Sequence, residues 1–74
     1  MEEKVFLEKM MELLDLDTPP HLTDSLNDFE EWDSLASVSF LGMAKKFTAT
    51  RIRPQKVAEA ETVGDLFALV KKEN

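Results

Sequence analysis

Apolar residues recur at helical spacing in three separate segments of this 74-residue chain, and no segment alternates long enough to build a sheet. The segments run from Glu2 to Leu14, from Leu35 to Phe47, and from Val63 to Lys72. Each carries an apolar stripe that must face a shared core. The sequence therefore predicts an all-α fold, a small helical bundle that occupies residues 1–74 as one domain.

The three stripes define the expected core. They comprise Phe6, Leu7, Met10, Leu13 and Leu14 in the first segment, Leu35, Val38, Leu41 and Ala44 in the second, and Val63, Leu66, Phe67 and Val70 in the third. Phe40, Met43 and Phe47 flank the second stripe. The side of the second helix opposite this stripe is expected to be exposed to solvent. It contains Ala36, Ser37 and Ser39, and Phe40 or Met43 could also lie on it.

Two connections join the three main helices. Pro19-Pro20 prevents the first helix from continuing, and no period holds from Asp15 to Asp33, so we expect a long first loop. A short turn over Thr23–Asn27 is expected there, capped by Thr23 or Asp24. The loop's scattered apolar residues should pin it over the bundle: Leu16, Leu22, Leu26, Phe29 and Trp32.

The second connection is expected to be extended over Thr48–Ile52 and then helical. Pro54 suits the first turn of a helix, which predicts a short helix over Pro54–Glu59 with Val57 facing inward. Thr62 is a suitable N-cap for the last helix. Gly42, inside the second helix, lowers helix stability by roughly 1 kcal/mol relative to alanine. It is either simply tolerated or allows a neighbouring chain to approach the helix closely.

Composition narrows the range of functions. The chain has no cysteine and begins with a charged segment, which favours a cytoplasmic protein without disulfides, signal peptide or membrane span. Residues 1–33 hold eleven acids and two lysines, whereas residues 34–74 hold four acids and seven basic residues. The net charge of −6 disfavours nucleic acid as a partner and favours basic protein surfaces, although acids also keep small domains soluble.

Ser34 stands where the acidic loop meets the second helix. Asp33 and Ser34 are both good N-cap types, and the positive end of a helix dipole stabilises a phosphate. A catalytic serine would need a base, and His21 is the only histidine. The chain lacks the Gly-x-Ser-x-Gly elbow. A serine hydrolase is thus the weaker interpretation, and attachment of a group to Ser34 the stronger.

The loop acids do not match a known metal site. Asp24, Asp28, Glu30, Glu31 and Asp33 lack the spacing and the central glycine of a calcium-binding loop. No metal ligand is therefore assigned, and these acids are interpreted as a solvated or partner-facing surface.

The sequence Asp33-Ser34-Leu35, at a loop-to-helix junction after one helix and a long loop, resembles the attachment site of acyl carrier proteins. The resemblance covers nearly the whole chain, because the helices follow in the family's order and lengths. Glu31-Trp32 resembles freestanding carriers. The implied fold is a four-helix bundle with three main helices and one short helix.

The resemblance implies a protein that is not itself an enzyme. Ser34 would receive a phosphopantetheine arm from coenzyme A through a separate phosphopantetheinyl transferase that uses magnesium. A cargo acid would ride on the arm as a thioester and be presented to an acyl ligase, synthase or acyltransferase of a fatty-acid, polyketide or specialised pathway. Asp33, Leu35 and Trp32 would flank the attachment, and Ile52 would line the cargo cavity. The carrier is expected to be a monomer.

Two departures from the family affect partner docking. The stretch Leu35–Ala44 contains no charged residue, and the second helix is about one residue short before Phe47. We therefore expect partners to contact the acids Glu30 and Glu31 and the apolar residues Phe40 and Met43. An unmodified helical interaction module, or a freestanding aminoacyl or peptidyl carrier, remains an alternative, and the cargo is open.

Overall fold

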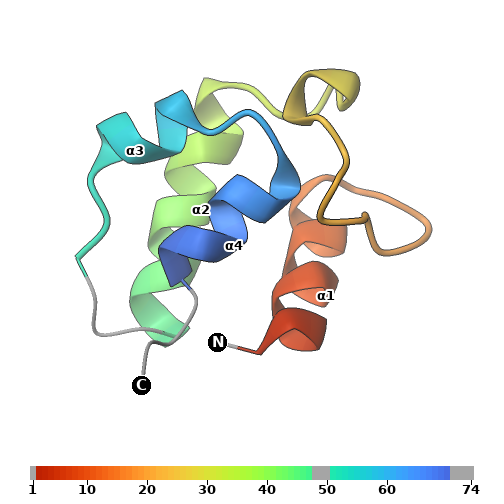
Figure 1. The fold of residues 1–74 in the computed structure, drawn as a ribbon, viewed down its shortest axis with the longest axis horizontal. Coiled ribbons are helices and arrows are strands. Elements are labelled where there is room, and N and C mark those ends of the chain that lie inside the picture. The colour runs from red at the N-terminus through yellow and green to blue at the C-terminus, as the bar shows by residue number, and fades with distance from the viewer. Residues whose placement is uncertain (1, 48–50, 71–74) are drawn as a thin grey trace.

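The computed structural model describes residues 2–47 and 51–70, and in this part it consists of helices joined by loops (Figure 1). The elements are α1 (Glu3–Leu13), the 3-10 helix η1 (Leu26–Asp28), α2 (Ser34–Phe47), α3 (Pro54–Glu59) and α4 (Val63–Val70). The expected all-α bundle of three main helices and one short helix is confirmed. The extended segment predicted at Thr48–Thr50 and the end of the last helix at Lys71–Lys72 lie outside the described residues.

Phe6 on α1 contacts both of the other main helices, α2 and α4. Its ring centroid lies 5.1 Å from that of Phe67 on α4 and 6.4 Å from that of Phe40 on α2, the latter edge to face. These distances are within the range of favourable aromatic pairs. In Figure 1, α4 lies between α1 and α2 in the view. The fully buried core is completed by Met10, Leu14, Leu26, Ala44, Val57, Val63, Leu66 and Val70.

The buried face of α2 differs from the expected stripe. Ala36, Phe40 and Ala44, spaced four residues apart, face the core, whereas Leu35 and Val38 are exposed. The prediction was wrong because apolar residues surround most of this helix, so their spacing does not single out one face. The two small alanines flank the large Phe40 ring, and this arrangement brings the helix close to the core.

α1 ends in a Schellman motif that turns the chain into the long loop. The Leu16 N–H donates to the Met11 carbonyl at 2.9 Å, and the Asp15 N–H donates to the Glu12 carbonyl at 3.3 Å. Asp15 has a φ of 54°, the left-handed conformation that this motif requires. Leu16 packs against the core and so fixes the direction in which the loop leaves.

The long loop is hydrogen-bonded to the entrance of α4. The Leu26 N–H donates to the Glu61 carbonyl at 2.9 Å, and Ser25 and Thr62 form an antiparallel bridge. The Gly64 N–H donates to the Leu22 carbonyl at 2.8 Å. The five apolar loop residues expected to pin the loop pack into or against the core, as predicted. The short turn begins at Leu26, later than expected, and Asp24 instead accepts a hydrogen bond from the His21 N–H at 2.8 Å.

Thr62 and Asp65 cap α4 reciprocally. The Asp65 N–H donates to Thr62 Oγ1 at 3.1 Å, while Asp65 Oδ2 accepts from the Glu61 N–H at 2.9 Å and the Thr62 N–H at 3.1 Å. This is a capping box with aspartate as its acid. The two backbone N–H groups hold the pKa of Asp65 below its ordinary value, first that of Glu61 and then that of Thr62. The expected Thr62 cap and the inward position of Val57 in α3 are confirmed.

Candidate functional site

Ser34 is the first residue of α2, and its side chain is exposed. Asp33 caps the helix, because its Oδ1 accepts the Ala36 N–H at 2.9 Å and its carbonyl accepts the Ser37 N–H at 3.0 Å. The Ser37 hydroxyl also donates to the Asp33 carbonyl at 3.1 Å. The cap fixes the start of the helix so that Ser34 follows it directly, beside the positive end of the helix dipole.

The Ser34 hydroxyl makes no side-chain hydrogen bond with residues 2–47 or 51–70. His21, the only histidine, is exposed on the first loop, and its Nδ1 lies 3.7 Å from Asp24 Oδ2. No hydrogen bond joins His21 to Ser34 in the described part of the chain. Activation of Ser34 by this histidine therefore finds no support in the geometry.

Trp32 anchors the end of the loop to the helix. Its ring is half-buried and lies edge to face with Phe40, with 6.4 Å between the centroids. The Trp32 N–H donates to the Phe29 carbonyl at 3.1 Å. These contacts give Trp32 a packing role that holds the Ser34 junction against the core.

A surface of acids and apolar side chains surrounds Ser34. Glu30, Glu31 and Asp33 are exposed on the loop before it. On α2 itself, the Leu35 side chain is 77% exposed and that of Val38 is 66% exposed. They lie on the part of α2 that has no charged residue, and exposed apolar side chains that lie together are a common feature of contact surfaces. We call these five residues the α2 entry surface.

The proposed docking residues of α2 require a correction. Phe40 is completely buried, and Met43 is half-buried and packs against the core, so Phe40 is not available to a partner. The acids Glu30 and Glu31 are accessible as expected. The exposed large apolar residues of α2 are Leu35, Val38 and, at its end, Phe47, which were expected in or beside the core stripe. The sequence offered no signal that would have found them, because apolar residues surround most of α2.

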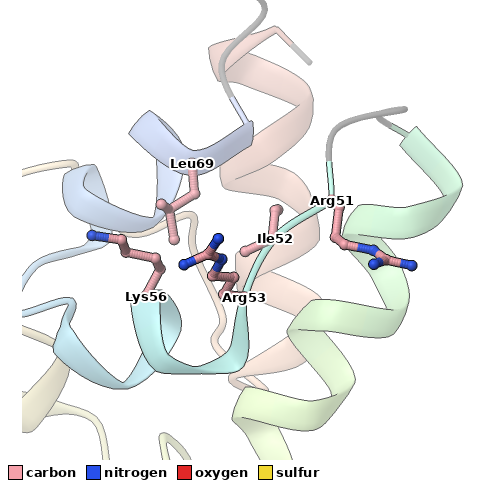
Figure 2. Close-up of a pocket in the computed structure, with 5 residues that line it drawn as sticks. All are labelled: Arg51, Ile52, Arg53, Lys56 and Leu69. Carbon is pink, nitrogen blue, oxygen red and sulfur yellow. The ribbon is translucent and has the colours of Figure 1, made fainter.

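Ile52 packs against the core and forms part of the wall of an open pocket of about 230 Å³ (Figure 2). The other residues of this wall are Arg51, Arg53, Lys56 and Leu69. The family resemblance implied a cargo-lining role for Ile52, and the basic side chains around it were not predicted. Their signal was present in the sequence: residues 45–56 contain five basic residues and no acid.

Two other structural findings concern the part of the chain described. Within residues 2–47 and 51–70, no three His, Asp or Glu side chains converge as a metal site would require. None of the helices described there combines the length and the apolar character needed to cross a bilayer.

Comparisons of the chain with protein-family models, with curated proteins and with solved structures found no match.

Proposed function

We propose that this chain is a carrier that bears an acyl group as a thioester on a phosphopantetheine arm attached to Ser34. The observation that carries the proposal is the exposed Ser34 hydroxyl at the first position of a capped helix, with no base hydrogen-bonded to it among residues 2–47 and 51–70. A hydroxyl in this position is accessible to another enzyme. The motif Asp33-Ser34-Leu35 and the order of the helices support the same function by resemblance.

The residues around Ser34 fit a phosphodiester. The first N–H groups of a helix have no partner within the helix, and the positive end of the dipole favours an anion there. Asp33 uses one carboxylate oxygen on the Ala36 N–H, and Ser34 itself is exposed to solvent. The exposed Leu35 side chain lies next in sequence and offers an apolar surface to the organic part of an arm.

The attachment is a group transfer by a separate enzyme. Ser34 Oγ loses its proton and forms a bond to the phosphorus that carries pantetheine. The phosphoanhydride bond of coenzyme A breaks, and the adenosine bisphosphate leaves. Once bound, the arm supplies a thiol for the thioester. The chain itself presents the arm, and a flexible tether raises the effective concentration of cargo at a partner's site.

The α2 entry surface is the proposed docking face for the transferase and for an acyl ligase, synthase or acyltransferase. Its acids, Glu30, Glu31 and Asp33, would attract a basic partner, and its two exposed apolar side chains would be buried on contact. Leu35 and Val38 replace Phe40 and Met43 in this role. The charge-poor helix makes the apolar part of docking weakly dependent on salt, whereas the contribution of the acids falls as salt rises.

The exposed pair Leu35 and Val38 also favours a second candidate function, a helical interaction module that is never modified. Such a module would use the same surface without any group on Ser34. A freestanding aminoacyl or peptidyl carrier would share the modified serine and differ only in the cargo.

The intact mass of the chain separates a carrier from an interaction module that is never modified. The chain is coexpressed with a phosphopantetheinyl transferase of broad specificity, and Ser34→Ala is compared with Ser39→Ala, which removes another exposed hydroxyl of α2. We expect one added arm on the wild type and on Ser39→Ala, and none on Ser34→Ala. An unmodified wild-type chain would favour the interaction module.

A further inference from the structure

Three basic residues of the second half line one open pocket. Residues 45–56 hold five of the nine lysines and arginines and no acid. Three of these five, Arg51, Arg53 and Lys56, line the open pocket, and Ile52 and Leu69 provide its apolar part. The wall of this pocket thus carries three positive charges and no negative one, although the chain as a whole has a net charge of −6.

Figure 2 shows how the side chains are arranged. Arg53 lies between Ile52 and Leu69, Lys56 extends on the other side of Leu69, and Arg51 extends away toward α2. The pocket thus brings together the segment before α3, α3 itself and the end of α4. Cationic and apolar side chains therefore lie next to one another in the pocket wall, which suits a ligand that carries both kinds of group.

The cations are available to a ligand. Within residues 2–47 and 51–70, the guanidinium groups of Arg51 and Arg53 form no ion pair or hydrogen bond. Lys56 Nζ lies 3.8 Å from Glu59 Oε1, and both side chains are more than half exposed. An exposed pair of this kind contributes little and can be exchanged for another carboxylate.

The size and openness of the pocket restrict its occupant. Pockets that enclose free small molecules usually measure about 300–1,000 Å³, and this one measures about 230 Å³ and is open to solvent. One apolar side chain of a peptide fits the space, with the flanking peptide bonds lying outside. A nucleic acid or an anionic membrane would bring its charge against the eleven acids of residues 1–33 as well, whereas a short acidic segment would contact only the basic face.

We propose that this pocket binds a short acidic peptide segment of a partner protein, with one apolar side chain against Ile52 and Leu69 and carboxylates on Arg53 and Lys56. The proposal does not depend on a group attached to Ser34. It assigns the chain a second contact surface, whose charge preference is opposite to that of the α2 entry surface.

The test titrates the isotopically labelled chain with a synthetic peptide of glutamates around one central leucine and follows the backbone amide resonances. We expect shifts concentrated at residues 51–56 and at Leu69. Arg53→Gln should weaken binding roughly two- to fivefold, as expected for one exposed ion pair. The matched control is Lys4→Gln on α1, which removes the same charge at another exposed position and should change binding by less than a factor of about two.

The peptide itself tests the apolar part without perturbing the protein. Replacing the central leucine by serine should weaken binding by roughly three- to tenfold, because an open pocket removes only part of a leucine from water. Equal losses in Arg53→Gln and Lys4→Gln, or undiminished binding of a peptide with glutamines in place of glutamates, would overturn the proposal. So would free hexanoate or phosphatidylserine vesicles binding as tightly as the leucine peptide.

Discussion

Gly64 is the position at which the fold depends most directly on the absence of a side chain. A Cβ atom at this residue would lie 2.9 Å from the Leu22 carbonyl oxygen, which is the same atom that accepts the Gly64 N–H at 2.8 Å. In Gly64→Ala the loop must therefore move away from α4, and this hydrogen bond must lengthen or break. Gly42 is the matched control, since a Cβ there meets no atom within 4 Å.

The two substitutions should have opposite effects on the free energy of unfolding. Overpacking costs about 1–3 kcal/mol, and a lost hydrogen bond about 0.5–1.5 kcal/mol. Replacing glycine by alanine in a helix stabilises it by up to about 1 kcal/mol, because alanine has the higher helix propensity. We expect Gly64→Ala to destabilise the domain by about 0.5–3.5 kcal/mol and Gly42→Ala to stabilise it by up to about 1 kcal/mol.

Urea unfolding, followed by circular dichroism and by the fluorescence of Trp32, measures both values. In thermal unfolding, a domain of this size shifts by about 4–8 °C for each kcal/mol, so the two variants should differ clearly. The reasoning is refuted if Gly64→Ala is as stable as the wild type, or if Gly42→Ala loses as much stability as Gly64→Ala.

Three further predictions concern α2 and α4. Phe40→Ala should cost about 3–5 kcal/mol, enough to unfold much of a small domain, whereas Leu35→Ala should stay within about 0.5 kcal/mol; similar unfolding midpoints for both would contradict the observed buried face of α2. Asp33→Ala should lose about 1 kcal/mol through the missing cap and Asp33→Asn much less, as measured by thermal melting; equal losses would show that the hydrogen bond to the Ala36 N–H is not the cause. The pKa of Asp65 is lowered in the folded state, so its contribution to stability is fully present above its unfolded pKa, near 3.8, and is lost as the pH falls through the lower folded value. Unfolding measured across that acidic range should show a smaller pH dependence for Asp65→Asn, and an unchanged dependence would exclude this role.

Much of the fold could be predicted because local signals and tertiary packing agree. The stripe of α4 is unambiguous, Pro54 begins α3, and Thr62 caps the last helix as expected. The end of α1 and the pinning of the loop by apolar residues also follow from the sequence. In each case the residue type favours one kind of position: proline in the first turn of a helix, threonine at an N-cap, and apolar side chains against the core.

The face of α2 could not be predicted, because Leu35 and Val38 are as apolar as the residues that pack inside. Only the tertiary contacts of Phe40 with Phe6 and Trp32 decide which side is buried. The pairing of the loop with the entrance of α4 was also missed. It consists of backbone hydrogen bonds between segments about 40 residues apart, which side-chain patterns do not indicate. The one local feature related to it is Gly64, whose lack of a side chain allows the Leu22 carbonyl to approach.

The position of Ser34 at the start of a helix was predictable from Asp33-Ser34-Leu35, since the cap and the loop precede it directly. The basic pocket was not predicted, because Leu69 reaches Ile52 only through the tertiary fold. The net charge of each half of the chain also gave no indication that Arg51, Arg53 and Lys56 line the same pocket.

The most direct test of the carrier function is the stoichiometry of modification of the purified chain by a phosphopantetheinyl transferase with coenzyme A and magnesium. Mass spectrometry of the intact chain and of its peptides should find one arm per chain on Ser34 and none on Ser34→Ala that retains its helical content. A folded wild-type chain that accepts no arm, or a Ser34→Ala chain that still accepts one, would contradict the account.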